Sequence, residues 1–304
     1  TQCFASSLRN VAKQHPNWEI SSSKDAARRL FARRGDKAAI KVGLDTLRDA
    51  RLPSLARNVS AIIREHEGDP NLSHERSREH WHLCVHFNRW KAEQPRSQLW
   101  EAAKKLRDEL YSDQAWGLTR LAGDDGDQPE FKVFPSQLIR GLDVVGDETR
   151  WPIERFAPML RWLRSAKAAP EAPLKLPEGS EQRPEPRLHL SIHAGEDYAH
   201  PLSGLRHVDE TVNFCEMRTG DRLGHALALG IPPNEWLQRH GDVTLPLDEH
   251  VDNLVWAWHQ AVQLSDLDVA KPVLPRLKRR IERLLPHVSW YPPDAAGSPL
   301  TDQH

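Results

Sequence analysis

Three short segments of this chain have the pattern of β-strands that end in residues able to do chemistry. Residues 188–192 alternate apolar and polar side chains and run into the sequence HAGE at 193–196. The sequence GLDVVGDE lies before it at 141–148, and RLGH follows at 222–225. Strands that carry such residues at their carboxyl ends, one after another, are typical of a (β/α)8 barrel with an active site on one rim.

Strand-like and helix-like patterns alternate on both sides of these segments, from about residue 80 onward. The strands predicted from period-two patterns are 82–87, 138–146, 187–193, 221–225 and 242–246. The helices predicted from apolar stripes are 97–111, 151–165, 204–219 and 249–285, the last interrupted at Pro272 and Pro275. Alternation of this kind predicts an α/β fold with a parallel sheet, and we expect a (β/α)8 barrel of which this segment holds only a part, with extra helices.

The chain divides on composition into three predicted regions. Residues 1–70 are expected to form a helical accessory or assembly segment, with helices at Lys24–Arg34, Asp36–Ala50 and Ser54–His66. Residues 71–250 are expected to be the central part of the barrel, and 251–304 a helical extension. Residues 166–187 are rich in Pro, Glu and Ala, which predicts a flexible insertion.

Composition narrows the class of protein. The 304 residues carry a net charge of −1, which gives no reason to expect binding to nucleic acid or to a membrane surface. No apolar stretch approaches the length of a transmembrane helix. The three cysteines lie far apart in the sequence, which fits a reducing compartment, and we expect a cytoplasmic protein. Because the sequence starts without Met and ends without a closing element, we expect it to be a piece of a longer polypeptide.

His193 and Glu196 are the strongest candidates for a chemical role. Neutral imidazole is the commonest zinc ligand, and a histidine at the tip of a barrel strand can reach a metal. A glutamate three residues later lies in the following turn and can carry protons to a substrate nitrogen. The alternative is a histidine that only caps the turn. His225, which follows Gly224 at another strand end, is a candidate partner that would orient a metal-bound water, although alone it is more often structural.

The segment 141–148 supplies the candidate substrate contacts Asp143 and Gly146. A glycine at a strand end allows a flat ring to approach the backbone. The alternative is a polar turn between strand and helix, in which Asp147 or Thr149 caps the helix.

The motif order GLDVVGDE, HAGE and RLGHALALG resembles the adenosine deaminase family of zinc amidohydrolases, over roughly residues 80–250. That family carries a GxDLAGxE-like strand, an HAGE strand and an RIGHG strand in this order. The resemblance implies a (β/α)8 barrel that removes ammonia from C6 of adenine by hydrolysis. It implies that His193 binds zinc, Glu196 protonates the ring nitrogen N1, and His225 orients and activates the zinc-bound water. Gly146 would contact the edge of the purine ring.

Two further blocks of the family pattern are not found in this sequence. The family has an HxH pair of zinc ligands on its first strand and an aspartate pair on its last strand. The only HxH is His80-Trp81-His82, which lies about where a third barrel strand is expected. We treat His80 and His82 as weaker candidates for metal binding. Either the first and last strands lie outside this segment, or the domain has lost its metal.

The helical front, the insertion and the extra helices are unlike a minimal nucleoside deaminase. As a whole the chain resembles more closely the large deaminase subunits of the bacterial RADAR anti-phage defence system. That resemblance implies adenine nucleoside or nucleotide substrates, a homo-oligomer and a partner ATPase. Two other hypotheses remain open at this point. One is a barrel without catalytic activity that serves as an assembly or ligand-sensing scaffold. The other is an amidohydrolase with a different substrate, such as a cyclic amide.

Overall fold

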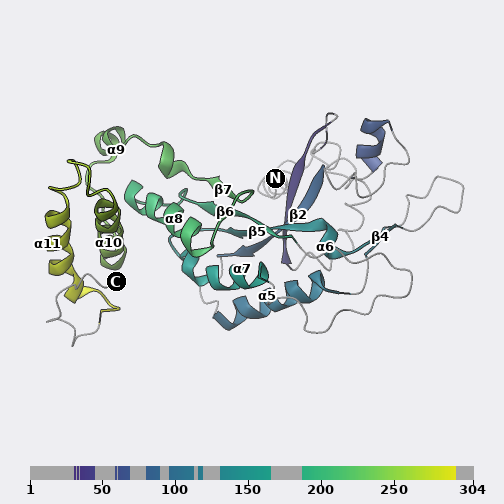
Figure 1. Cartoon of the computed structure of the whole chain (residues 1–304), viewed down its shortest axis with the longest axis horizontal. Coiled ribbons are helices and arrows are strands. Elements are labelled where there is room, and N and C mark those ends of the chain that lie inside the picture. The colour runs from purple at the N-terminus through teal and green to yellow at the C-terminus, as the bar shows by residue number, and fades with distance from the viewer. Residues whose placement is uncertain are drawn as a thin grey trace, which may run out of the picture. The chain divides into compact units, whose positions relative to one another are not determined.

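The computed structural model describes residues 35–44, 61–68, 80–89, 96–112, 116–118, 131–165 and 187–291, together with residues 31, 33 and 59. The chain forms two compact units, which are described separately below (Figure 1). The first unit comprises Thr1–His193 and Asn213–Gly224, and the second comprises Ala194–Val212 and His225–His304. The predicted helix at 24–34 and the predicted insertion at 166–187 lie almost entirely outside the described residues.

The first unit is built on a five-stranded parallel sheet that curls into a half-barrel. Its strands, in spatial order, are Ala38–Gly43 (β1), Trp81–Asn88 (β2), Ile139–Val145 (β5), His189–Ala194 (β6) and Arg222–His225 (β7). The predicted parallel α/β fold is therefore confirmed. A separate antiparallel pair joins Trp116–Leu118 (β3) to Phe131–Val133 (β4).

The two faces of this sheet differ in chemistry. Along β6, Leu190 and Ile192 are buried, while His189, Ser191 and His193 point to the other face. The apolar face packs into one core with the helices Arg96–Leu110 (α5) and Ala157–Leu163 (α7), which lie side by side along the sheet (Figure 1). The opposite face of β6 carries polar side chains, among them His193, which lies next to the carboxyl end of the strand.

Strand β1 corrects a prediction. A helix was expected over Asp36–Ala50, but Ala38–Gly43 forms a strand that pairs in parallel with β2. Ile40 and Val42 are buried and the partly exposed Lys41 lies between them, which is the period-two pattern of a strand. Both are β-branched, and such side chains pack well on a pleated surface and less well in a helix. The helix predicted at Ser54–His66 is confirmed where it is described, over residues 61–66.

Most of the other predicted elements are confirmed with shifted ends. Helix α7 is shorter than the predicted 151–165, because the turn Ile153–Arg155 is a 3₁₀ helix. The strand predicted at 242–246 is wrong, since this segment forms no strand and leads into the helix Leu247–Gln263 (α10) with Pro246 at its N-cap. A proline lacks the N–H that a strand ladder needs, so Val243 and Leu245 alone were a weak strand pattern.

The second unit is helical. It contains most of Pro201–Phe214 (α8), and also Pro233–His240 (α9), α10 and Leu274–Leu284 (α11). The sequence predicted that Pro272 and Pro275 interrupt a helix over 249–285, and the structure confirms a break between Gln263 and Leu274. Pro275 lies in the first turn of α11, where a proline favours the start of a helix. Helix α9 was not predicted. No helix in the described ranges is long and apolar enough to span a membrane.

A buried polar network joins α8 to α10 within this unit. The Arg206 guanidinium donates from Nε to Asn253 Oδ1 at 2.8 Å, and Asn253 donates to Ser203 Oγ at 2.8 Å. Ser203 in turn donates to Glu249 Oε1 at 2.7 Å. Buried polar groups that are mutually hydrogen-bonded fix one arrangement of the helices that carry them. The network therefore holds in place the helix that follows the HAGE turn.

Candidate functional site

The three motifs found in the sequence lie on three neighbouring strands. GLDVVGDE runs along β5 and beyond its end, HAGE begins on β6, and RLGH is β7 itself. In a parallel sheet the carboxyl ends of all strands meet at one edge, which is where barrels of this kind place their active sites. The sheet order thus brings the motif ends to one edge.

Within the first unit, Asp143 lies between a lysine and a histidine. Lys41 Nζ donates to Asp143 Oδ2 at 2.5 Å, and His193 Nδ1 lies 3.1 Å from Asp143 Oδ1. The Asp143 side chain has no exposed surface, and the side chains of Lys41 and His193 are 17% and 14% exposed. A carboxylate only accepts hydrogen bonds. For His193 to donate one here, a neutral ring must carry its proton on Nδ1, and its lone pair is then on Nε2.

Gly224, of the RLGH motif, makes room for the His193 ring. A Cβ at position 224 would lie 3.1 Å from His193 Cδ2 and 3.3 Å from its Cα. Those distances are shorter than ordinary carbon contacts. A glycine at position 224 therefore leaves room for the His193 ring on the neighbouring strand, which a larger side chain would crowd.

His86 on β2 belongs to the same face and was not singled out from the sequence. It is level with Asp143 across the β2–β5 pairing. Burial lowers the pKa of His86, and the nearby Lys41 and His193 lower it further, against the opposing effect of Asp143. Its Nδ1 is buried and has no hydrogen-bond partner among the described residues. The pattern of β2 offered a clue, because His82 and His86 are separated by an even number of residues and share a face.

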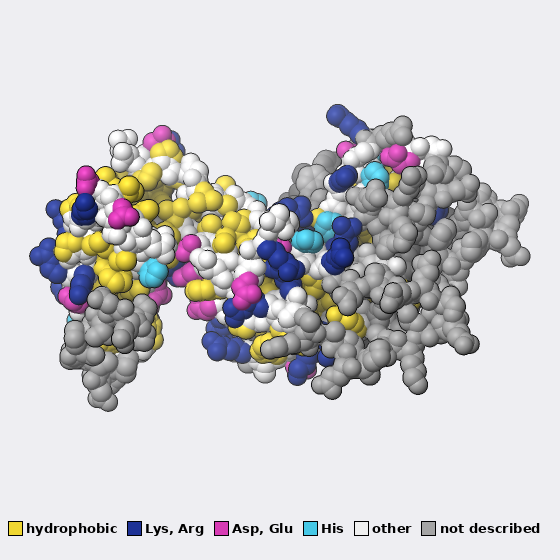
Figure 2. Space-filling model, in the orientation of Figure 1, with side chains coloured by type: hydrophobic (Ala, Val, Ile, Leu, Met, Phe, Trp, Pro, Cys, Tyr) yellow, Lys and Arg dark blue, Asp and Glu magenta, His cyan; other side chains and the backbone are white. Residues whose placement is uncertain are grey.

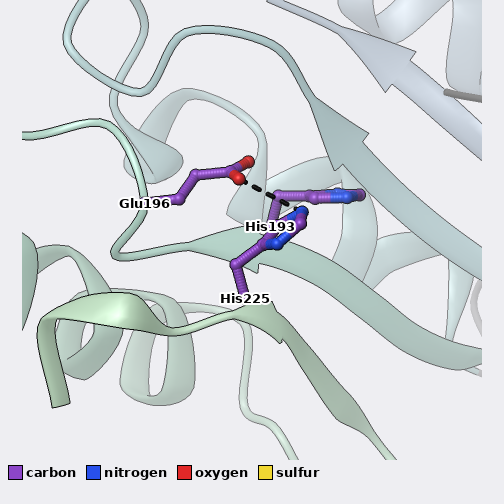
Figure 3. Close-up of side chains that lie close together, drawn as sticks. All are labelled: His193, Glu196 and His225. Atoms are coloured by element: carbon purple, nitrogen blue, oxygen red, sulfur yellow. Dashed lines mark ion pairs between the residues drawn. The ribbon is translucent and has the colours of Figure 1, made fainter. Parts of the chain in front are cut away.

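Within the second unit, Glu196 and His225 form an ion pair. Glu196 Oε2 lies 3.1 Å from His225 Nε2, as the dashed line in Figure 3 marks. Glu196 lies in the turn after β6, and His225 is the last residue of β7. Their side chains are 25% and 49% exposed, so both can reach a ligand. The distance permits a proton to pass between them.

The backbone that carries this pair is strained. His225 and Ala226 have φ angles of +59° and +48°, a left-handed conformation that non-glycine residues rarely adopt. Ala226 N donates to Ala194 O at 3.1 Å, and Ala228 N donates to Gly195 O at 3.0 Å. These bonds hold the end of β7 against the HAGE turn. Strain of this kind is commonly found where a side chain must be aimed for function.

The boundary between the two units crosses both motifs, after His193 and after Gly224. His193 therefore belongs to the first unit, while Glu196 and His225 belong to the second. Glu196 follows His193 by only three residues, so the covalent chain alone keeps their Cα atoms within about 11 Å.

Gly195, inside HAGE, is expected to be intolerant of substitution. Its φ is +73°, and a Cβ there would lie 2.6 Å from Val208 Cγ2 and 3.2 Å from Gly204 O. Gly195→Ala should lower the free energy of unfolding by about 1–3 kcal/mol, through the overlap and the disfavoured φ. Urea denaturation would measure the loss. Gly230→Ala is the matched control, because a Cβ at that position meets nothing within 4 Å. Equal stability of the two variants would contradict this account.

The end of GLDVVGDE forms a tight turn. Gly146 has a φ of +106°, and its carbonyl accepts a 3.4 Å hydrogen bond from Arg89 Nη1. Asp147 Oδ1 accepts from Thr149 N at 3.0 Å and from Thr149 Oγ1 at 2.6 Å. The hydroxyl hydrogen bond is the main reason that the pKa of Asp147 is lowered. Asp147 thus hydrogen-bonds within a polar turn, but neither it nor Thr149 caps the following helix as the structural alternative predicted, since the 3₁₀ helix that follows has Pro152 at its N-cap. The substrate contacts of Gly146 and Asp143 stay predictions.

His80 and His82 lie at the amino end of β2. His80 immediately precedes the strand, and His82 is level with Ala39 of β1. His86, four residues later, is the residue level with Asp143, which puts His82 about 13 Å further back along the strand. The structure therefore does not bring the HxH pair beside His193.

His82 differs from His193 in its surroundings, which are basic. Histidine side chains also lie beside Lys and Arg side chains on the face drawn in Figure 2. Burial, followed by Arg140, Arg222 and His189, lowers the pKa of His82 from 6.5 to about 4. Between these values the unfolded chain binds more protons than the folded one, so the free energy of unfolding should fall as the pH drops from 6.5 to 4.

We expect His82→Gln to flatten that pH dependence, because the substitution removes the proton binding of the unfolded state at this position. Chemical denaturation at several pH values would measure the slope. His259→Gln on the exposed side of α10 is the control. An unchanged slope in His82→Gln would contradict a lowered pKa of His82 in the folded protein.

Comparisons with known proteins add no assignment. No protein-family model matches the chain, and no curated protein matches it. The function has to be inferred from the motifs and the contacts described above.

Proposed function

We propose that this protein is a zinc-dependent hydrolase that removes the 6-amino group of adenine nucleosides or nucleotides and gives the inosine form. The observation that carries the proposal is the placement of GLDVVGDE, HAGE and RLGH on the neighbouring parallel strands β5, β6 and β7. These are the segments whose order in the sequence resembles the adenosine deaminase family. Their functional residues lie at or just beyond the carboxyl ends of the strands.

The available side chains fit zinc. A histidine nitrogen is among the ligands that zinc prefers, and His193 can supply one. Asp143 accepts a hydrogen bond from Nδ1 of His193, which leaves the Nε2 lone pair for a metal, and metal-binding histidines usually have such a partner. Bound zinc supplies a water that is nucleophilic near neutral pH. In this proposal His193 is the zinc ligand from HAGE.

Glu196 and His225 would move the protons. Glu196 donates a proton to the ring nitrogen N1, which makes C6 electrophilic, and His225 accepts a proton from the attacking water. The oxygen of that water would become bonded to C6. His225 would then return its proton to the amino nitrogen, so that the C6–N bond breaks and ammonia leaves, and the proton of the new C6 hydroxyl would pass to Glu196, which leaves a carbonyl at C6. The 3.1 Å separation of Glu196 and His225 supports a shared proton between the two groups. Gly146 has no side chain to keep a flat purine ring from the backbone.

The test is a direct assay of the full-length protein loaded with zinc. Adenosine, AMP, ATP and dATP would each be offered, with loss of adenine absorbance followed and the product identified by chromatography. Conversion of any of them to its hypoxanthine form is the expected result. The absence of conversion by protein shown to contain zinc would overturn the proposal in favour of an amidohydrolase with another substrate. The absence of bound zinc would favour a non-catalytic scaffold.

The narrower similarity to anti-phage deaminase subunits extends the proposal. On this similarity we propose a cytoplasmic homo-oligomer that acts with a partner ATPase in antiviral defence. The same assay bears on it, because preference for ATP or dATP over adenosine is expected of such an enzyme, and preference for adenosine would count against it.

A further inference from the structure

We infer that Lys41 and Asp143 are positioning residues, which fix the tautomer and the orientation of His193. The link to zinc rests on the proposed function, whereas the hydrogen-bond arrangement does not. Asp143 accepts from both neighbours through different oxygens, Oδ2 from Lys41 and Oδ1 from His193. Each oxygen of the carboxylate thus has a defined partner.

Burial makes this arrangement specific. The Asp143 side chain is fully buried, so water does not compete for its oxygens. In such surroundings a charged acceptor holds its donors more strongly than at a surface. A His193 ring flipped about its χ2 would turn a carbon toward Asp143 Oδ1 and lose this hydrogen bond. Asp143 therefore selects one ring orientation as well as one tautomer.

Lys41 comes from the far side of β2. In the strand register, Lys41 is level with Cys84, which is level with Gly141, two residues before Asp143. Its ammonium reaches past β2 to a carboxylate that lies two strands away. A lysine is long enough for this, and its charge balances that of the buried carboxylate. Lys41 therefore acts on His193 only through Asp143.

A positioning pair differs from a purely structural ion pair in its effect on His193. A structural pair would alter stability alone when it is removed. A positioning pair would also alter the protonated nitrogen of His193 and the affinity for zinc. Loss of an outer partner of a ligating histidine typically weakens metal binding by about 10- to 100-fold.

The test compares Asp143→Asn, Lys41→Met and Lys41→Arg in the full-length protein. Zinc affinity would be measured by competition with a chromogenic chelator, and the His193 tautomer by long-range proton–nitrogen NMR of histidine-labelled, metal-free protein. We expect a zinc Kd raised about 10- to 100-fold in Asp143→Asn and raised less in Lys41→Met. Lys41→Arg should keep most of the affinity, because it keeps the charge. Lys104→Met, at an exposed ion pair with Glu101, is the control.

The tautomer and the zinc Kd test the positioning role of Asp143 and Lys41 separately from deaminase activity. Wild-type protein with Nδ1 of His193 protonated, and a tautomer that changes in Asp143→Asn, supports the positioning role even if no deamination is found. A folded Asp143→Asn variant with the wild-type tautomer and zinc Kd would overturn it. If Asp143→Asn does not fold, the lysine variants decide, and equal zinc Kd values in wild type, Lys41→Met and Lys41→Arg would overturn it.

Discussion

Replacing Glu196 by Gln is expected to lower the rate of adenine deamination by about 10²- to 10⁴-fold while zinc stays bound. The amide is close to the carboxyl group in size but cannot donate a proton to N1 or exchange one with His225, whose Nε2 lies 3.1 Å from the carboxylate. Steady-state rates and metal content of the same preparation would be measured together. Zinc content should be unchanged, because the proposed metal contact of HAGE is made by His193.

A matched control is Glu216→Gln. Glu216 is also paired with a cation, Arg161 at 3.3 Å, but its side chain is 71% exposed, and it is not part of any of the three motifs. This variant should keep the wild-type rate. Full activity of Glu196→Gln would remove Glu196 from the mechanism and with it the main chemical basis of the proposed reaction.

The second large effect is expected on stability. Asp221→Ala should lower the free energy of unfolding by about 3–5 kcal/mol, because it leaves a buried cation without its partner. Asp221 Oδ2 accepts from Arg164 Nη2 and from Arg218 N, both at 2.9 Å, and Oδ1 accepts from Leu190 N at 2.8 Å. The side chains of Asp221 and Arg164 are only 1% and 6% exposed.

Asp221 thus joins the start of β6, the end of α7 and the turn before β7 within the first unit. Burial lowers the pKa of Arg164, and the charge of Asp221 opposes this effect. Urea denaturation of purified protein would measure the effect. Asp268→Ala is the control, since Asp268 is 95% exposed in its pair with Lys271 and should change stability little. A loss below about 1 kcal/mol for Asp221→Ala would contradict the role assigned to this carboxylate.

The sequence predicts those parts of the fold in which local pattern and tertiary contacts agree. Strands β2, β5, β6 and β7 alternate or end in glycine-flanked polar residues, and helix α5 has a clear apolar stripe. Strand β1 was missed because only Ile40 and Val42 show its period, inside a stretch whose composition also suits a helix. Its strand conformation comes from pairing with β2, which is a tertiary contact that local propensity does not contain.

The residues of the candidate site could also be predicted only in part. His193, Glu196 and His225 could be found because each lies at a predicted strand end beside a small residue. Lys41 could not, since it belongs to no motif, and the only signal for His86 was the strand face that it shares with His82. Their positions next to Asp143 depend on the order and register of β1, β2 and β5. Register is a property of the assembled sheet, and one sequence alone does not determine which distant strands become neighbours.

The pairing of Lys41 with Asp143 also has an evolutionary consequence. The two residues are 102 positions apart, and only one of them lies in a recognisable motif. An uncompensated loss of either charge would leave the other buried, so single changes at these positions should be selected against. In related sequences, positions 41 and 143 should therefore change together or not at all, and a lineage that has replaced both by apolar residues should also have lost the histidine at 193.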